Sequence, residues 1–167
     1  TKDGLFLEGT CQQSGMREEE REAFLDLFSE EETAKRKGSF VAFCVMGGIF
    51  GEGIDLKNER LIGAMIVGTG LPQVSNEREI LMNYYEKRLG CGFDYAYRYP
   101  GMNKVLQAAG RVIRTAEDVG IIELLDDRFL QSDYQNLFPR EWESRSICTL
   151  ATVEGQLIHF WEGKEEN

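Results

Sequence analysis

The sequence lacks the excess of basic residues that free-standing nucleic-acid-binding domains usually carry. It has 19 Lys and Arg residues and 29 Asp and Glu residues, which gives a formal net charge of -10. Because such domains neutralise phosphate groups with positive charge, this balance argues against a free-standing nucleic-acid clamp. It does not exclude a local basic patch.

The sequence also has few candidate metal ligands. It contains one histidine, His159, and its four cysteines occur without a C-x-x-C spacing: Cys11, Cys44, Cys91 and Cys148. Scattered cysteines are typical of reduced cytosolic thiols and a lone histidine is usually structural, so we predict no metal site. No apolar run approaches the roughly 20 residues that span a bilayer, and the N-terminus has no signal-peptide pattern. We therefore expect a soluble cytoplasmic protein.

Two phosphate-binding patterns are absent as well, the Walker form G-x-x-x-x-G-K-[ST] and the Rossmann form G-x-G-x-x-G. A glycine-rich stretch is present instead, because "GGIFGEGIDL" at 47–56 follows directly on the apolar run "FVAFCVM". These residues alone favour a tight strand-to-loop turn over a phosphate cradle. Glu52 and Asp55 are then candidate polar ligands for a ribose, an arginine or a nucleic-acid-facing loop.

The residues that are present fit one α/β domain. A chain of 167 residues with 42% hydrophobic content can bury a sizeable core. Apolar runs without polar alternation predict strands covered on both faces of a parallel sheet, at 38–46, 60–68 and 119–126. Helix-length segments at 75–89 and 101–115 complete the pattern of a doubly wound domain. The first two strands are joined only by a loop, which leaves their pairing open.

Both ends of the chain carry further patterns. The stretch "SGMREEEREAFLDLFSEEE" predicts an amphipathic helix that is capped by Ser14 and buries Phe24, Leu27 and Phe28. The tail from Ser144 predicts a strand and a helical end.

Four polar or small residues on the 101–115 helix share one face by their i, i+3, i+4, i+7 spacing: Gln107, Gly110, Arg111 and Arg114. Two forked arginine donors beside a glycine that permits close approach suit a phosphate group. Surface arginines paired with Glu117 or Asp118 explain the same spacing equally well.

The glycine stretch, the following "IVGTGLPQ" and the block "QAAGRVIRTAEDVGIIELLDDRF" resemble, in this order, motif V, its following loop and motif VI of the DinG/XPD family of superfamily 2 DNA helicases. The resemblance extends to "GMREEEREAFLDLF" and to "PREW" at 139–142. It implies a RecA-like three-layer domain with a mainly parallel sheet and helices on both faces. It also implies that 1–142 is the C-terminal motor domain, with its N-terminal part missing, and that 143–167 is an extension.

The resemblance further implies roles for individual residues. Arg111 and Arg114 correspond to the arginine fingers of motif VI, which reach the γ-phosphate of ATP. The nucleotide side of the cleft is implied to include Gln107, Gly110, Glu52, Gly53 and Asp55. The DNA side is implied to include Gly47 and Gly48, whose backbone approaches a phosphate, and Lys104 is a candidate for the local basic groove.

The other parts of such a motor are implied to lie in the first RecA-like domain. That domain holds ATP and Mg²⁺ through the Walker motifs and often carries an iron-sulfur cluster, so this chain alone is not expected to hydrolyse ATP. The implied partners are single-stranded or forked DNA and that first domain, in the bacterial cytosol or nucleoid. The alternative is a non-catalytic RecA-like module that senses nucleotide or binds proteins.

Three further groups of residues are candidates, and the last two of them have two interpretations each. Arg98 is a second candidate for contact with single-stranded DNA. Tyr95, Tyr97 and Tyr99 alternate, which favours an extended segment packed on one face over base stacking. Asp127 and Arg128 favour a structural pair that pins a loop over a functional role.

Overall fold

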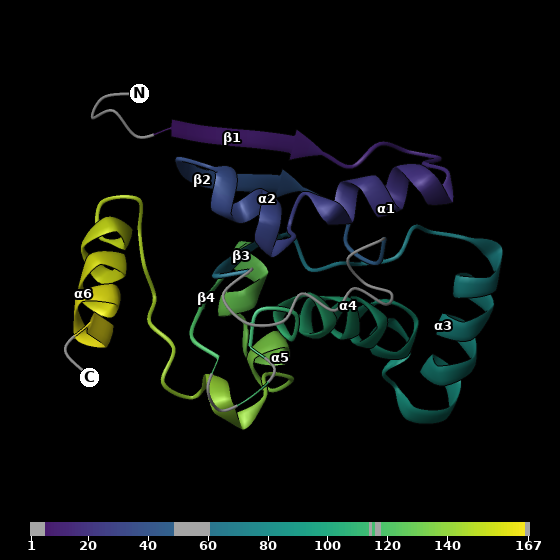
Figure 1. Ribbon diagram of the computed structural model, residues 1–167. Helices are drawn as coiled ribbons and strands as arrows, with labels where there is room; N and C mark the ends of the chain where they lie inside the picture. Colours follow the sequence, from purple (N-terminus) through teal and green to yellow (C-terminus); the bar gives the residue numbers. More distant parts are fainter. Residues whose placement is uncertain (1–5, 49–60, 114, 116–117, 166–167) are drawn as a thin grey trace. The chain divides into compact units, whose positions relative to one another are not determined.

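The computed structural model describes residues 6–48, 61–113, 115 and 118–165 (Figure 1). The chain forms two compact units, Thr1–Gln135 and Asn136–Asn167. In the first unit the strands are β1 (Phe6–Cys11), β2 (Gly38–Phe43), β3 (Gly63–Val67) and β4 (Ile121–Leu125). Its helices are α1 (Glu18–Asp26), α2 (Glu30–Lys35), α3 (Asn76–Leu89), the π-helix η2 (Asp94–Arg98), α4 (Tyr99–Ala109), the 3-10 helix η3 (Asp127–Leu130) and α5 (Ser132–Gln135). The second unit contains the 3-10 helix η4 (Arg140–Trp142) and α6 (Val153–Glu165).

The strands form two parallel pairs, each closed by helical crossovers. β1 pairs with β2 in the register Phe6 to Gly38, across α1 and α2. β3 pairs with β4 in the register Gly63 to Ile121, across α3, η2 and α4. Parallel strands need such crossovers, and the predicted α/β class with parallel strands is confirmed. Within the described residues β2 and β3, whose pairing the sequence leaves open, belong to different pairs.

Strands β2 and β3 are covered on one face rather than both, which corrects the expectation from their apolar runs. On β3, Ile66 is 4% exposed, whereas Met65 and Val67 are each 71% exposed. On β2, Phe43 is 65% exposed, while Phe40 packs edge-on against Phe28 at 5.2 Å between ring centroids. Among the described residues, each strand pair therefore leaves large apolar side chains on its second face.

Helix α1 supplies the core beneath β2. Phe24 and Phe28 are 5% and 6% exposed and Leu27 packs against them, which confirms the predicted apolar stripe. The helix begins at Glu18 rather than after Ser14, because Arg17 caps it: the Arg17 backbone N–H donates to Glu20 Oε2 at 2.7 Å. Since a helix leaves its first N–H groups unpaired, this bond fixes the start of α1.

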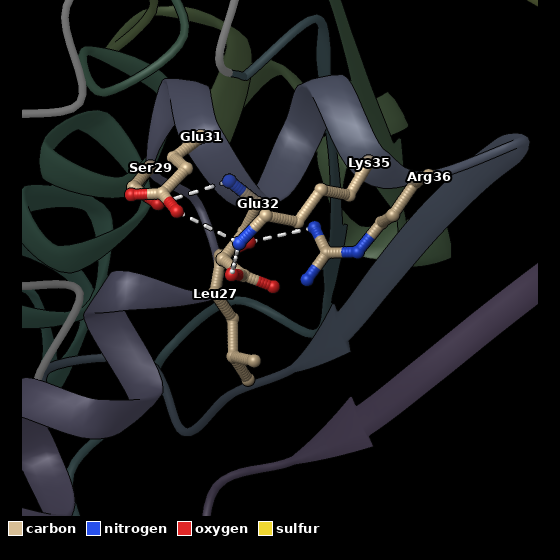
Figure 2. A network of polar contacts seen from close by, with 6 residues as sticks. All are labelled: Leu27, Ser29, Glu31, Glu32, Lys35 and Arg36. Atoms are coloured by element: carbon tan, nitrogen blue, oxygen red, sulfur yellow. Dashed lines mark hydrogen bonds and ion pairs between the residues drawn. The ribbon is translucent and has the colours of Figure 1, made fainter.

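A short polar network holds α2 (Figure 2). Ser29 Oγ accepts the backbone N–H of Glu32 at 3.3 Å and so caps the helix. One turn later, Lys35 Nζ donates to Glu31 Oε1 at 2.9 Å and to Glu32 Oε1 at 2.8 Å. These i, i+3 and i, i+4 pairs are exposed and each contributes only a few tenths of a kcal/mol.

Arg36, directly after α2, makes the more buried contacts. Its Nη1 donates to the Leu27 carbonyl oxygen at 2.6 Å, and its Nε lies 3.4 Å from Glu8 Oε2. The guanidinium carbon lies 3.8 Å from the centroid of the Phe40 ring. With 12% of its side chain exposed, Arg36 ties the end of α1 to both β1 and β2.

The remaining helices follow the expected signals in part. α3 begins after Ser75, which accepts the Arg78 N–H at 3.3 Å, and ends at Gly90 with φ +68°, as the 75–89 prediction requires. In the tail, α6 confirms the helical end, but the expected strand is absent from the described residues 136–165. None of the helices in the described ranges has the length and apolar character that a membrane crossing requires.

Candidate functional site

The turn that follows β2 contains the glycines Gly47 and Gly48. Gly47 has φ +82°, and the Gly48 N–H donates to the Val45 carbonyl oxygen at 2.9 Å. The side chain of Gln12, which follows β1, supports this turn because its Oε1 accepts the Val45 N–H at 3.0 Å. The backbone N–H of Gln12 in turn donates to the Phe43 carbonyl oxygen at 2.8 Å. The turn therefore lies at the carboxyl ends of a parallel strand pair, where ligand sites of open α/β sheets usually occur.

Lys104 of α4 lies against this turn. A Cβ atom on Gly47 would sit 3.4 Å from Lys104 Cδ and 3.5 Å from Lys104 Cε. The structure therefore brings together two of the three candidate DNA contacts, which are far apart in the sequence. The third, Gly48, belongs to the same turn and faces Gln12, since its Cβ would lie 2.8 Å from Gln12 Nε2.

Helix α4 ends earlier than the sequence predicts. Its last residue is Ala109, and Gly110 follows with φ -66° and ψ -1°. The Arg111 N–H then donates to the Ala108 carbonyl oxygen at 3.1 Å, an i to i-3 bond that tightens the end into a turn. The Gly110 N–H still donates to the Leu106 carbonyl oxygen at 2.9 Å, so Gly110 keeps the helical bonding of α4, whereas Arg111 lies in the turn beyond it. The expectation that the face of Gln107 continues through Arg111 is therefore wrong.

The physical reason lies in residue identity and packing. Glycine is a poor helix former, and Val112, two residues on, is 5% exposed. Its Cγ1 lies 2.5 Å from where a Cβ on Gly120 would be, so the chain leaves the helix to bury Val112 beside the start of β4. Helix periodicity alone could not anticipate this change of direction.

The other candidate residues of the nucleotide side are only partly described. Gln107 is exposed on α4 and Arg111 is half-buried. Outside the described residues lie Glu52, Gly53, Asp55, Arg114 and Glu117. Asp118, the other acid considered for arginine pairing, accepts the Thr115 N–H at 2.8 Å through Oδ2.

Arg98 has a structural role in place of the expected DNA contact. Its side chain is 17% exposed and forms ion pairs with Asp94 at 2.6 Å and with Asp133 at 3.0 Å. Its guanidinium also lies 5.3 Å from the centroid of the Tyr134 ring. The two carboxylates neutralise the guanidinium. Since Asp94 lies in η2 and Asp133 lies in α5, Arg98 links these two helices.

The tyrosine segment is helical rather than extended, which corrects a second expectation. Its residues form the π-helix η2 and the start of α4. Tyr97 is 6% exposed and donates to Glu79 Oε1 at 2.9 Å, while Tyr95 stacks on Tyr85 with 4.1 Å between centroids. Burial, and then the hydrogen bond to Glu79, raises the pKa of Tyr97. The preference for packing over base stacking is confirmed for Tyr97.

The structural interpretation of Arg128 is confirmed, but its partner is Asp126 rather than Asp127. Arg128 Nε donates to Asp126 Oδ1 at 2.8 Å and Nη2 donates to Asp126 Oδ2 at 2.7 Å. Asp126 Oδ1 also accepts the Arg128 backbone N–H at 2.9 Å and so caps η3. These hydrogen bonds from Arg128 lower the pKa of Asp126 to about 2.

Sequence reasoning missed two parts of this region. Strand β1, "FLEGTC", has no long apolar run, and its pairing with β2 became visible only in the fold. Gln12 carries no motif signal either, although it supports the glycine turn. Within the described ranges, no group of three or more His, Cys, Asp or Glu side chains is placed to hold a metal ion.

The parallel strand pairs, the helical crossovers and the glycine turn at the strand ends define an α/β domain with a candidate ligand edge. A family model described as the helicase C-terminal domain matches residues 5–145. The chain belongs to this helicase C-terminal domain family.

Curated relatives agree with this assignment. The chain is 32% identical over 141 residues to a regulator of telomere elongation helicase 1 homolog of Anopheles gambiae, covering 77% of the chain and 14% of that protein. It is 32% identical over 153 residues to the ATP-dependent DNA helicase chl1 of Schizosaccharomyces pombe, covering 84% and 18%. It is 28% identical over 103 residues to the general transcription and DNA repair factor IIH helicase subunit XPD of Dictyostelium discoideum, covering 60% and 13%. The resemblance to DinG/XPD-type helicases is confirmed.

A solved XPD helicase structure aligns with 78% of this chain and 33% of that one, at 18% identity and a TM-score of 0.49. The chain spans less than one fifth of the length of the curated relatives named above.

Proposed function

We propose that the chain is the second motor domain of an ATP-dependent DNA helicase. Two observations support this proposal. The family match covers residues 5–145, and proteins named as ATP-dependent DNA helicases are among the similar proteins. Within the fold, the proposal is carried by the contact between Lys104 and Gly47. This contact places a lysine side chain beside exposed backbone in the turn at the end of a strand.

On the DNA side, this turn is suited to a phosphate of single-stranded or forked DNA. Backbone beside a glycine accommodates a close approach, and the lysine supplies the charge that binds a phosphate independently of base sequence. Such a contact is local, so the overall charge of -10 does not oppose it. The first motor domain contributes the rest of the DNA groove in this proposal.

On the nucleotide side, Arg111 and Arg114 act as arginine fingers toward ATP held with Mg²⁺ by the first motor domain. Gln107, Gly110, Glu52, Gly53 and Asp55 complete this side of the cleft. Phosphoryl transfer places negative charge on the equatorial phosphate oxygens, and an arginine delivered from another domain stabilises that charge. Because the phosphate-binding lysine loop belongs to the first domain, we expect no ATP hydrolysis by this chain alone.

The experiment is the substitution Arg114→Ala in the full-length protein. We expect DNA-stimulated ATP hydrolysis to fall by about 10³-fold or more, with nucleotide binding mostly intact, because an arginine finger acts in the transition state. Turnover and ATP affinity are measured separately, by phosphate release and by equilibrium titration.

Arg21→Ala is the matched control. Arg21 is a surface arginine whose 3.7 Å pair with Glu18 is exposed, so its removal leaves turnover unchanged. Full turnover in Arg114→Ala would contradict the arginine-finger role.

A further inference from the structure

Three segments of the first unit meet through glycines at the ligand edge. They are the turn after β2 (45–48), the loop after β3 (68–71) and residues 101–104 of α4. We call their meeting point the glycine joint, which consists of Gly47, Gly70, Gly101 and the Lys104 side chain. The contacts of Gly70 and Gly101 are set by the absence of a side chain, and the Lys104 stem packs against Gly47 at ordinary van der Waals distance.

The contact between α4 and the β3 loop is the tightest part of the joint. A Cβ atom on Gly101 would lie 2.5 Å from the Thr69 carbonyl oxygen and 3.1 Å from Leu71 Cδ2. A Cβ atom on Gly70, where φ is +65°, would lie 2.8 Å from the Gly101 carbonyl oxygen. Because real Cβ atoms do not approach backbone this closely, helix and loop touch backbone to backbone.

The β2 turn joins the same contact from the other side. Met46 Sδ lies 3.2 Å from the Cβ position of Gly70, and Lys104 Cδ lies 3.4 Å from the Cβ position of Gly47. The surroundings are closely packed, since Met102, Val105 and Thr69 are 2%, 0% and 1% exposed. A shift of α4 along its axis therefore has to carry both loops with it.

From this geometry we propose that the glycine joint makes α4 and the turn after β2 move as one body. The functional consequence rests on the proposed function. α4 carries Gln107 and leads into Arg111 on the nucleotide side, whereas the turn presents Gly47 and Gly48 to DNA. Nucleotide-driven movement of the arginine segment then reaches the DNA contact directly through packed side chains, in addition to any route along the chain through motif V.

The experiment is hydrogen–deuterium exchange of the full-length protein, read on peptides from 44–48. The Val45 and Gly48 amides donate hydrogen bonds at 3.0 and 2.9 Å and report whether the turn is held. In Gly101→Ala we expect these amides to exchange about tenfold faster or more, since the new Cβ forces α4 off the loop. Gly155→Ala is the control, because Gly155 also lies in a helix and nothing is within 4 Å of its Cβ position.

A second pair of variants keeps the test decisive where Gly101→Ala fails to fold. Lys104→Met retains a stem of similar length over Gly47, whereas Lys104→Ala removes it. We expect wild-type exchange in Lys104→Met and faster exchange in Lys104→Ala. Equal exchange rates in the two variants would overturn the joint. If both exchange slowly, the lysine stem does not hold the turn. If both exchange fast, the ammonium group holds the turn and the stem does not.

The coupling is read from the ratio of DNA-stimulated to unstimulated ATP hydrolysis. We expect this ratio to fall about tenfold in Gly101→Ala and to stay unchanged in Gly155→Ala. A loss of folded protein alone would lower both rates in parallel and leave the ratio intact, which would refute the coupling role. Absence of DNA-stimulated hydrolysis in the wild type would instead refute the proposed function, while the exchange comparison still decides whether the joint exists.

Discussion

The pair between Asp126 and Arg128 allows a quantitative prediction of stability. Asp126 accepts two hydrogen bonds from the Arg128 guanidinium at 2.7 and 2.8 Å, and one from its backbone N–H at 2.9 Å. We consider Asp126→Asn, which removes the charge but keeps an oxygen that can still cap η3. The variant therefore isolates the charged part of the interaction from the helix cap.

The magnitude follows from the pKa. The pKa of Asp126 falls from 3.8 to about 2, mainly through the hydrogen bonds from Arg128. At about 1.4 kcal/mol per pKa unit, the upper bound is about 2.5 kcal/mol. The Arg128 side chain is 41% exposed, so solvent screens the pair and we expect a loss of about 1 kcal/mol in the free energy of unfolding at pH 7.

The sign of the pH dependence also follows. Because the pKa in the folded state lies below its ordinary value, the pair stabilises the fold fully above about pH 5. The stabilisation is lost as the pH falls from about 4 to 2, where Asp126 takes up its proton. The difference between wild type and Asp126→Asn should therefore shrink toward zero over that range.

Urea unfolding at pH 7, 4 and 2.5 measures this difference. Asp127→Asn is the matched control, since Asp127 is the exposed neighbour in the same acidic pair, and we expect a change within about 0.5 kcal/mol. A difference between wild type and Asp126→Asn that is constant with pH would refute the ion-pair argument. A larger loss of unfolding free energy in Asp127→Asn than in Asp126→Asn would show that Asp127, and not Asp126, stabilises the loop.

Three shorter predictions concern other parts of the first unit. Cys44 and Cys148 are both exposed, but desolvation of the Cys44 thiol by the surrounding chain raises its pKa to about 12, so iodoacetamide at pH 8 should label Cys148 before Cys44, as measured by peptide mass spectrometry. Arg36→Met removes the partly buried 2.6 Å hydrogen bond to the carbonyl at the end of α1 and should lower the free energy of unfolding by about 2 kcal/mol, whereas Lys37→Met should change it by less than about 0.5 kcal/mol. Gly110→Ala should leave the melting temperature nearly unchanged, since φ is -66°, yet lower ATP turnover of the full-length protein if a phosphate approaches this glycine.

Much of the secondary structure could be predicted from local pattern. The apolar runs gave the positions of β2, β3 and β4, and the helix-length segment 75–89 gave α3. These features are local, because a cap or an apolar run acts within a few residues. β1 could not be found in this way, since its residues become a strand through pairing with β2.

The tyrosine segment shows how an alternating pattern can mislead. Alternation predicts one buried face of an extended chain, but a π-helix with tyrosines at alternate positions also buries one of them. Tyr97 reaches Glu79 of α3 and Tyr95 stacks on Tyr85, also of α3. Contacts with another helix, which spacing does not encode, decided the conformation of this segment.

The candidate site was predictable in its residue types but not in its assembly. The sequence analysis selected Gly47 and Lys104 for separate reasons. Their contact is part of the glycine joint, which only the fold brings together. Arg111 was chosen for a helix face that ends before it. What holds Arg111 is a turn bonded to Ala108 and the burial of Val112 beside Gly120.

This anchoring changes how the arginine segment relates to the sheet. Gly120 directly precedes β4, and the Ile121 N–H donates to the Ile62 carbonyl oxygen at 3.0 Å, just before β3. Arg111 therefore lies between two anchors, α4 before it and Val112 after it, which packs against Gly120 at the start of β4. Since α4 also contacts the β3 loop through Gly101, both anchors depend on β3. The position of Arg111 is thus set by the strand pair and by the packing of α4 upon it, and not by the periodicity of one helix.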